Sequence, residues 1–219
     1  MFVAYHRIQS GIHLLYALSL IHIYGTNKIR NYAIITLFLN CGLRLSELVN
    51  INIKNITGTT LRVVGKGNKT RDVHLNSACI NAINEYLKIR PNEGISYEDR
   101  DALFISRHNK RISRRMVQTL VSNYIEKANL SNEKYSTHKL RHTAATLMHQ
   151  NGVDIRVLQE ILGHENLGTT QIYTHLESKQ IQDAMEKNPL NSIKPPKAEN
   201  IDLSPNKEKN KKSKKKEQE

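Results

Sequence analysis

The chain is poor in cysteine. Only Cys41 and Cys79 occur among its 219 residues, and neither belongs to a Cys-x-x-Cys pair. Two cysteines are too few for a disulfide framework, so the sequence favours a reducing compartment, the cytoplasm. A long hydrophobic run is also lacking, because the apolar stretch at residues 14–23 is far shorter than a membrane span. Few basic residues precede that stretch and it has no clear cleavage site, which argues against a signal peptide. No membrane association is expected.

Two motifs for metal and nucleotide chemistry are incomplete. His138 and His142 have the spacing of a zinc pair, but residues 139–141 lack the glutamate of a His-Glu-x-x-His site and bring two cations instead. The GKG at residues 65–67 fails as a nucleotide phosphate loop, because Thr60 stands where that loop needs glycine. We therefore expect neither a metal nor a nucleotide cofactor.

Acidic residues are fewer than basic ones, which gives a formal net charge of +13. Residues 194–219 hold nine lysines and five acidic residues, so this tail contributes +4 and the rest of the chain keeps +9. Such a balance favours a polyanionic partner, although a lysine-rich surface that serves only solubility remains an alternative. A hydrophobic content of 38% supports one globular domain with additional segments.

The pattern along the body predicts mainly helices and one small antiparallel sheet. Apolar periodicity, capping residues and glycine stops place helices at residues 27–40, 77–90, 113–128, 137–151, 154–162 and 176–188. Ser77 and Thr137 are the expected caps of two of them, and Asp154 is expected to start a third. The β-rich runs 59–64 and 70–75 flank a glycine-rich turn and predict a hairpin, and residues 103–106 suggest a further short strand.

Four short motifs combine side chains suited to chemistry on a phosphodiester. They are GLRLSE at residues 42–47, VVGKGNKTR at 63–71, THKLRHT at 137–143 and LGHENLGTTQIY at 162–173. A tyrosine can attack phosphorus, arginine can hold phosphate oxygens in a fork, and histidine can move protons. Each motif alone is weak, and the information lies in their combination and order.

Six residues of these motifs resemble, in identity and order, the active-site set of the tyrosine recombinases of the phage integrase family, in their Xer-like bacterial branch. They are Arg44, Lys66, His138, Arg141, His164 and Tyr173. The resemblance runs from about residue 27 to residue 187. It implies a catalytic domain that is mainly α with a small antiparallel β-sheet (α+β), and an enzyme that needs neither metal nor ATP.

The resemblance also implies how the reacting atoms are handled. Tyr173 would attack a DNA phosphorus and form a 3′-phosphotyrosyl link, while His138 takes the tyrosine proton as general base. Lys66 would protonate the leaving 5′ oxygen as general acid, with Lys69 as the rival in the same turn. The three remaining residues would stabilise charge on the phosphate.

Two flanking features bear on the phosphate-binding residues. Arg141 is expected in the first turn of its helix, where the helix dipole disfavours a cation and attracts an anion. Glu47 stands three residues after Arg44. It would either orient Arg44 or remain a solvated surface residue.

The expected function is site-specific recombination or integration on double-stranded DNA, in which the protein self-associates and, by resemblance, forms a tetramer in the synapse. Two alternatives stay open. One is strand relaxation of the type IB topoisomerase kind, and the other is a non-catalytic DNA-binding remnant. In relatives the segment after the tyrosine docks on a neighbouring protomer. For residues 176–188, packing on their own domain is the equal alternative.

Three regions are predicted along the chain. Residues 1–24 form an atypical segment that is either native or a truncation scar, residues 25–188 form the catalytic domain, and residues 189–219 form a disordered lysine-rich tail. The N-terminal helical domain that completes the DNA clamp in full-length relatives is not recognised. The chain is thus expected to be a fragment, the product of a truncated gene or a minimal member.

Overall fold

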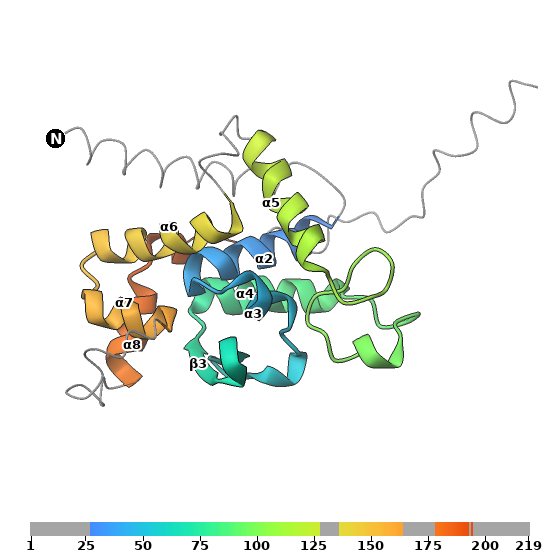
Figure 1. Cartoon of the computed structure of the whole chain (residues 1–219), viewed down its shortest axis with the longest axis horizontal. Coiled ribbons are helices and arrows are strands. Elements are labelled where there is room, and N and C mark those ends of the chain that lie inside the picture. Colours follow the sequence, from blue (N-terminus) through green and yellow to red (C-terminus); the bar gives the residue numbers. More distant parts are fainter. Residues whose placement is uncertain (1–26, 128–135, 164–177, 193, 195–219) are drawn as a thin grey trace, which may run out of the picture.

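A computed structural model describes residues 27–127, 136–163, 178–192 and 194 of the chain. In this part, helices pack around a central helix, and a three-stranded antiparallel sheet in the order β1-β2-β3 lies along one side of them (Figure 1). The architecture is mainly α with a small antiparallel sheet, as the sequence predicted.

Helix α2 (Lys28–Cys41) forms the centre of the core. Every residue from Ile29 to Cys41 is buried, so this helix is covered on all sides, and α4 and α6 pack against it. It ends where predicted, at Gly42, whose φ of 57° is left-handed and whose N–H donates to the Phe38 carbonyl oxygen. A Cβ at Gly42 would lie 2.6 Å from a methyl group of Leu162, so glycine also lets the end of α7 approach.

The sheet consists of β1 (Ile56–Thr57), β2 (Thr60–Val64) and β3 (Thr70–His74). The β2–β3 hairpin confirms the predicted strands, and its turn contains a short 3₁₀ segment, Lys66–Asn68. The hairpin buries three of its own side chains on the inner face, Leu61, Val63 and Val73. The two-residue strand β1 is too short to leave an alternating pattern and was not predicted.

Among the remaining helices, the five from α4 to α8 are near their predicted bounds. The remaining helices are α3 (Leu45–Val49), α4 (Ser77–Ile89), α5 (Arg114–Lys127), α6 (Thr137–Gln150), α7 (Ile155–Leu162) and α8 (Ser178–Glu186), with short 3₁₀ helices at Ile53–Asn55, Tyr97–Asp99 and Pro189–Ser192. Helix α3, of five residues, was not predicted.

Three details of the sequence-based prediction were wrong. The α4 cap is Asn76 rather than Ser77, because the Asn76 side chain accepts the Cys79 N–H. The α6 cap is Ser136 rather than Thr137, because the Ser136 hydroxyl accepts the Lys139 N–H. Residues 103–106 form no strand; Ile105 makes only an isolated bridge with Arg111.

Helix α8 packs on its own domain, which is the second of the two arrangements considered for this segment. Ala184 and Met185 are buried, and Asn76 donates to the Met185 carbonyl oxygen. Asn188 is buried too and donates to Leu39. The fold continues past the predicted boundary at residue 188, since Leu190 lies in the core.

The two cysteines lie side by side in the core, between α2 and α4. Their sulfur atoms are 3.6 Å apart, which is longer than a disulfide bond, and both are free thiols. Burial raises the pKa of the Cys79 thiol, and the neighbouring Cys41 adds to this. The helices of the described residues include none that is long and apolar enough to cross a membrane.

Candidate active site: an arginine cluster at the end of helix α7

Three arginines from three different elements hold the last three carbonyl groups at the C-terminal end of α7. Arg71 of β3 donates to Ile161 over 3.0 Å, Arg141 of α6 donates to Leu162, and Arg44 donates to Gly163 over 3.0 Å. A helix C-terminus carries partial negative charge and leaves carbonyl groups without helical partners. The three guanidinium groups offset this partial charge and bind the free carbonyl groups. They also fix the chain immediately before His164.

Glu47 of α3 links two of these arginines. Its side chain is fully buried; one carboxylate oxygen accepts Arg44 Nη1–H at 2.9 Å and the other accepts Arg71 Nη2–H at 2.8 Å. The second oxygen also accepts the backbone N–H of Arg44 at 2.8 Å. Glu47 therefore orients Arg44, and its alternative as a solvated surface residue is excluded by its burial.

An open pocket of about 320 Å³ lies beside this cluster. Its lining brings together three of the predicted site residues, Arg44, His138 and Arg141. His138 and Arg141 share a face of α6 because they are three positions apart. The His138 ring is exposed and meets the His142 ring edge-on, with ring centroids 5.7 Å apart. The pocket thus combines guanidinium groups with an accessible imidazole.

The predicted placement of Arg141 was wrong, and the electrostatic argument changes with it. Arg141 is the fifth residue of α6 and lies beyond its first turn. Its side chain donates to the carbonyl oxygens of Gly42, just after α2, and Leu162, at the end of α7. Two helix C-termini therefore stabilise this cation, which the sequence had assigned to an unfavourable helix N-terminus.

The cluster carries excess positive charge at short range. Three arginines surround one carboxylate, a formal net charge of +2. Burial lowers the pKa of Arg141 to about 10, and the nearby charges of Arg44 and Arg71 contribute. Arg141 nevertheless stays protonated near neutral pH. Because the cations repel one another, an anion in the pocket would be stabilised, and the half-exposed Arg44 is accessible to it.

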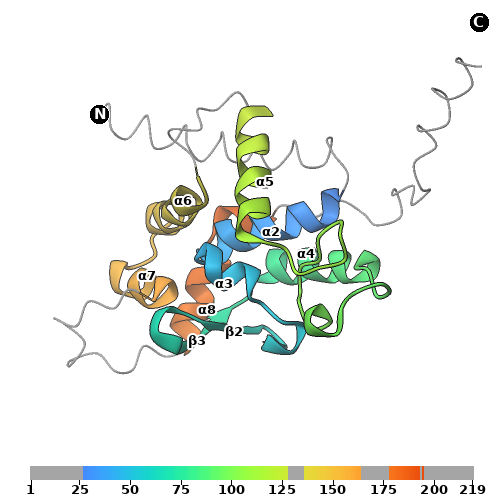
Figure 2. The same ribbon diagram turned by 45° about the vertical axis from the view of Figure 1, so that its right-hand side comes forward.

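Three predicted site residues lie partly or wholly outside the described part of the chain. These are His164, Tyr173 and the side chain of Lys66. The backbone before Lys66 is described, and a Cβ at Gly65 would lie 3.6 Å from a Glu47 carboxylate oxygen. The start of the hairpin turn therefore lies against the Arg44–Glu47 pair. In Figure 2 this turn lies close to α7.

Two residues of this region were missed by the sequence analysis. Arg71 lies two residues before Val73 on β3 and so shares its inward face, and a charged residue on an inward face was the available signal. Arg114, the first residue of α5, lines the same pocket as Arg44 and His138. A cation at a helix N-terminus is mildly unfavourable for the helix, which was the corresponding signal.

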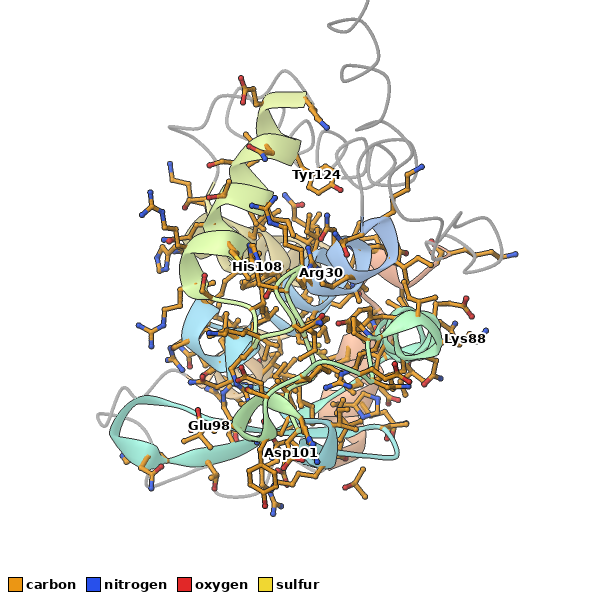
Figure 3. The ribbon with its side chains drawn as sticks, turned by 90° about the vertical axis from the view of Figure 1, so that its right-hand side faces the viewer. Arg30, Lys88, Glu98, Asp101, His108 and Tyr124 are labelled. Atoms are coloured by element: carbon orange, nitrogen blue, oxygen red, sulfur yellow. The ribbon has the colours of Figure 1, made fainter. Side chains whose placement is uncertain are left out.

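A second basic cleft, of about 540 Å³, follows α5 from Arg115 to Lys127 and is also lined by the start of α2. Its lining includes Arg30, Arg107, His108, Arg115 and Lys127. Figure 3 labels Arg30, His108 and Tyr124 at this cleft, where α2 meets α5. Consecutive residues of α5, Arg114 and Arg115, thus face two different basic clefts.

The described part of the chain thus combines a mainly helical fold with a pocket in which arginines lie beside an exposed imidazole. Comparison with known proteins gives the family: residues 14–180 match the model of the phage integrase family, and the chain belongs to it. Over 167 residues it is 60% identical to the tyrosine recombinase XerC of Caldanaerobacter subterraneus subsp. tengcongensis, covering 76% of this chain and 47% of that protein. The XerC of Vibrio cholerae is 43% identical over 152 residues, covering 68% and 48%.

Solved structures agree on the architecture. The XerA recombinase has a TM-score of 0.59 at 32% identity, covering 78% of this chain and 60% of that one. The XerH site-specific recombinase bound to palindromic difH substrate, a post-cleavage complex, has a TM-score of 0.61 at 29% identity, covering 80% and 51%. The chain spans about half the length of the curated relatives it matches.

The buried Glu47 carboxylate generates the first prediction. Glu47→Gln keeps the side-chain shape but removes the charge that two arginines share, so the guanidinium groups lose their counter-ion while Arg71 stays buried. Removing one partner of a buried ion pair costs about 3–5 kcal/mol. We expect the free energy of unfolding, measured by urea denaturation, to fall by about 3 kcal/mol.

The matched control is Asp72→Asn. Asp72 also binds an arginine through both carboxylate oxygens, but its pair with Arg62 is exposed. Solvent screens such a pair, so this variant should unfold at nearly the wild-type urea concentration. Equal losses in the two variants would contradict the role given to the buried carboxylate.

Proposed function

We propose that the chain is the catalytic part of a site-specific tyrosine recombinase, which cuts and rejoins double-stranded DNA through a covalent tyrosine intermediate. The observation that carries this proposal is the pocket where Arg44, Arg141 and His138 meet under excess positive charge. A phosphodiester is the anion that this set suits best, because arginine forks match phosphate oxygens and imidazole can exchange a proton.

The arginines stabilise the negative charge that develops on the phosphate during the reaction. Attack at phosphorus gives a pentacoordinate state with more negative charge on the non-bridging oxygens. Arg44 and Arg141 are fixed in advance by Glu47 and by the carbonyl groups of Gly42, Leu162 and Gly163. Little reorganisation is then needed at the moment of reaction, which is the condition for effective electrostatic stabilisation. We assign His164, the residue after Gly163, to the same phosphate.

The proton transfers complete the step. The Tyr173 hydroxyl oxygen forms a bond to phosphorus and gives its proton to His138. The bond from phosphorus to the 5′ oxygen breaks, and that oxygen takes a proton from Lys66. The products are a 3′-phosphotyrosyl ester and a 5′-hydroxyl group. Attack by the 5′-hydroxyl of another strand reverses the step, so no energy source is consumed.

The two clefts beside α5 suggest how the duplex is held. Arg114 lies in the pocket with Arg44, and Arg107, His108 and Arg115 line the neighbouring cleft. Cations spaced along one face suit the successive phosphates of a DNA strand. We propose that this face follows the backbone next to the reacting phosphate.

Assembly and location follow from the same proposal. Exchange between two DNA sites requires several protomers, so we propose self-association on DNA, with a tetramer in the synapse. The free, buried thiols Cys41 and Cys79 are consistent with a reducing cytoplasm. The matched proteins described above are recombinases, so strand relaxation by a topoisomerase is not favoured.

The nucleophile gives a direct test. The probe is a nicked duplex recovered from a randomised pool by covalent capture on the wild-type chain. Cleavage beside the nick releases a short strand and traps the enzyme. Tyr173→Phe should abolish the SDS-resistant adduct and leave binding, measured by mobility shift, nearly unchanged. The matched control is Tyr97→Phe, at an exposed tyrosine that does not line the arginine pocket, and it should form the adduct normally. An adduct in Tyr173→Phe would contradict the assignment, and no adduct from the wild type would contradict the proposed function.

The leaving group tests the general acid. Sulfur in place of the bridging 5′ oxygen leaves as a thiolate and needs no proton. Lys66→Ala should therefore slow adduct formation on the oxygen substrate by about 100-fold or more and react nearly normally on the sulfur substrate. Arg141→Ala should be slow on both, because it removes charge stabilisation. Lys69→Ala is the matched control in the same turn. Rescue by sulfur in Lys69→Ala, but not in Lys66→Ala, would assign the acid to the other lysine.

A further inference from the structure

Arg71 has no role in the mechanism above, yet it joins three segments of the site. It lies on β3, opposite Val63 of β2. Its two terminal nitrogens donate in different directions, one to the Ile161 carbonyl oxygen at 3.0 Å and the other to Glu47 at 2.8 Å. A single guanidinium therefore connects the hairpin, α3 and the end of α7.

The hairpin turn begins just beyond these contacts. Two residues after Val63 comes Gly65, whose N–H donates to the Lys69 carbonyl oxygen at 2.8 Å and closes the base of the turn. A Cβ at Gly65 would be 3.8 Å from Arg44 Nη1. Lys66 is the next residue. Its backbone is thus separated from the Arg71 anchor by only a few residues along a paired strand.

The environment of Arg71 indicates a role beyond packing. Its side chain is 18% exposed, and burial lowers its pKa, an effect that Glu47 partly offsets. Its Nε is buried and has no hydrogen-bond partner among the described residues. Burying an incompletely paired guanidinium is costly, and an apolar side chain would hold the strand with less penalty. A buried ion pair of this kind defines geometry better than it adds stability.

The backbone conformation of Gly163 and its lack of a side chain accommodate Arg71. Its φ is +61°, and a Cβ there would lie 2.8 Å from Arg71 Cδ and 2.9 Å from Nε. The left-handed glycine that ends α7 therefore also makes room for the Arg71 side chain. The arginine lies between the hairpin and the helix end that precedes His164.

We propose that Arg71 is a positioning residue that ties the Lys66 hairpin to the phosphate-holding cluster. This rests on the function proposed above, in which Lys66 protonates the leaving oxygen. Arg44 does not need Arg71, because Glu47 and Gly163 hold Arg44 through three hydrogen bonds of their own. Loss of Arg71 should therefore displace the general acid and leave the phosphate grip in place.

The oxygen and sulfur substrates distinguish these two effects. We use the full chain with Arg71→Met, which keeps the length but removes all donors, and Arg71→Lys. Arg71→Met should form the adduct about 100-fold more slowly on the oxygen substrate and within about fivefold of the wild-type rate on the sulfur substrate. Arg71→Lys should be intermediate on oxygen, because an ammonium group cannot reproduce the two-armed fork.

The matched control is Arg62→Met. Arg62 is on the same hairpin and also binds a carboxylate, but it lies on the exposed face. It should react normally with both substrates. Equal slowing of Arg71→Met on oxygen and sulfur would show that Arg71 acts through Arg44 instead, and normal rates on both would show that it positions nothing. Either result overturns the proposal.

A measurement without DNA keeps the proposal testable even if the wild-type chain forms no adduct, which would contradict the proposed function alone. Hydrogen exchange at the Gly65 amide should speed up in Arg71→Met by at least about tenfold more than exchange in α2 and α4. Arg62→Met should show no such increase. Equal acceleration in α2 and α4, or none at Gly65, would mark Arg71 as a general structural residue and contradict the inference.

Discussion

The site depends on one buried carboxylate. Glu47 of α3 accepts three hydrogen bonds, two from Arg44, the residue before α3, and one from Arg71 of β3. Without this negative charge, the guanidinium groups at the end of α7 would face one another with only carbonyl dipoles to compensate them. A buried charge is tolerable when it is paired and hydrogen-bonded, and here the pairing also fixes where the arginines point.

Carbonyl groups at helix C-termini offset the rest of the positive charge of the arginines. The C-terminal carbonyls of α7 each bind a different arginine, and Gly42, which ends α2, binds Arg141 as well. The glycines at both ends are required by close approach, to Leu162 in one case and to Arg71 in the other. The fold thus brings two helix termini to one point and places cations there. The same point carries the backbone that leads into His164.

Much of this could be predicted from the sequence, for identifiable reasons. The core helix α2 and the β2–β3 hairpin follow from local patterns: an apolar run ended by glycine, and two β-rich runs around a glycine-rich turn. The caps Asn76 and Ser136 were each missed by one residue, because neighbouring serine and threonine residues compete for the same position. The link from Arg71 to Ile161 spans 90 positions, and no local pattern specifies which carbonyl a distant arginine reaches. Arg141 was misjudged for the same reason, since its partners lie on α2 and α7.

A double-mutant cycle between Glu47 and Arg71 tests most directly whether one carboxylate organises the cluster. The free energy of unfolding is measured for Glu47→Gln, Arg71→Met, the double variant and the wild type. If the two side chains act as one unit, the double variant should lose much less than the sum of the single losses, with a coupling of about 2 kcal/mol. Losses that add to within about 0.5 kcal/mol would show independent side chains and contradict the account.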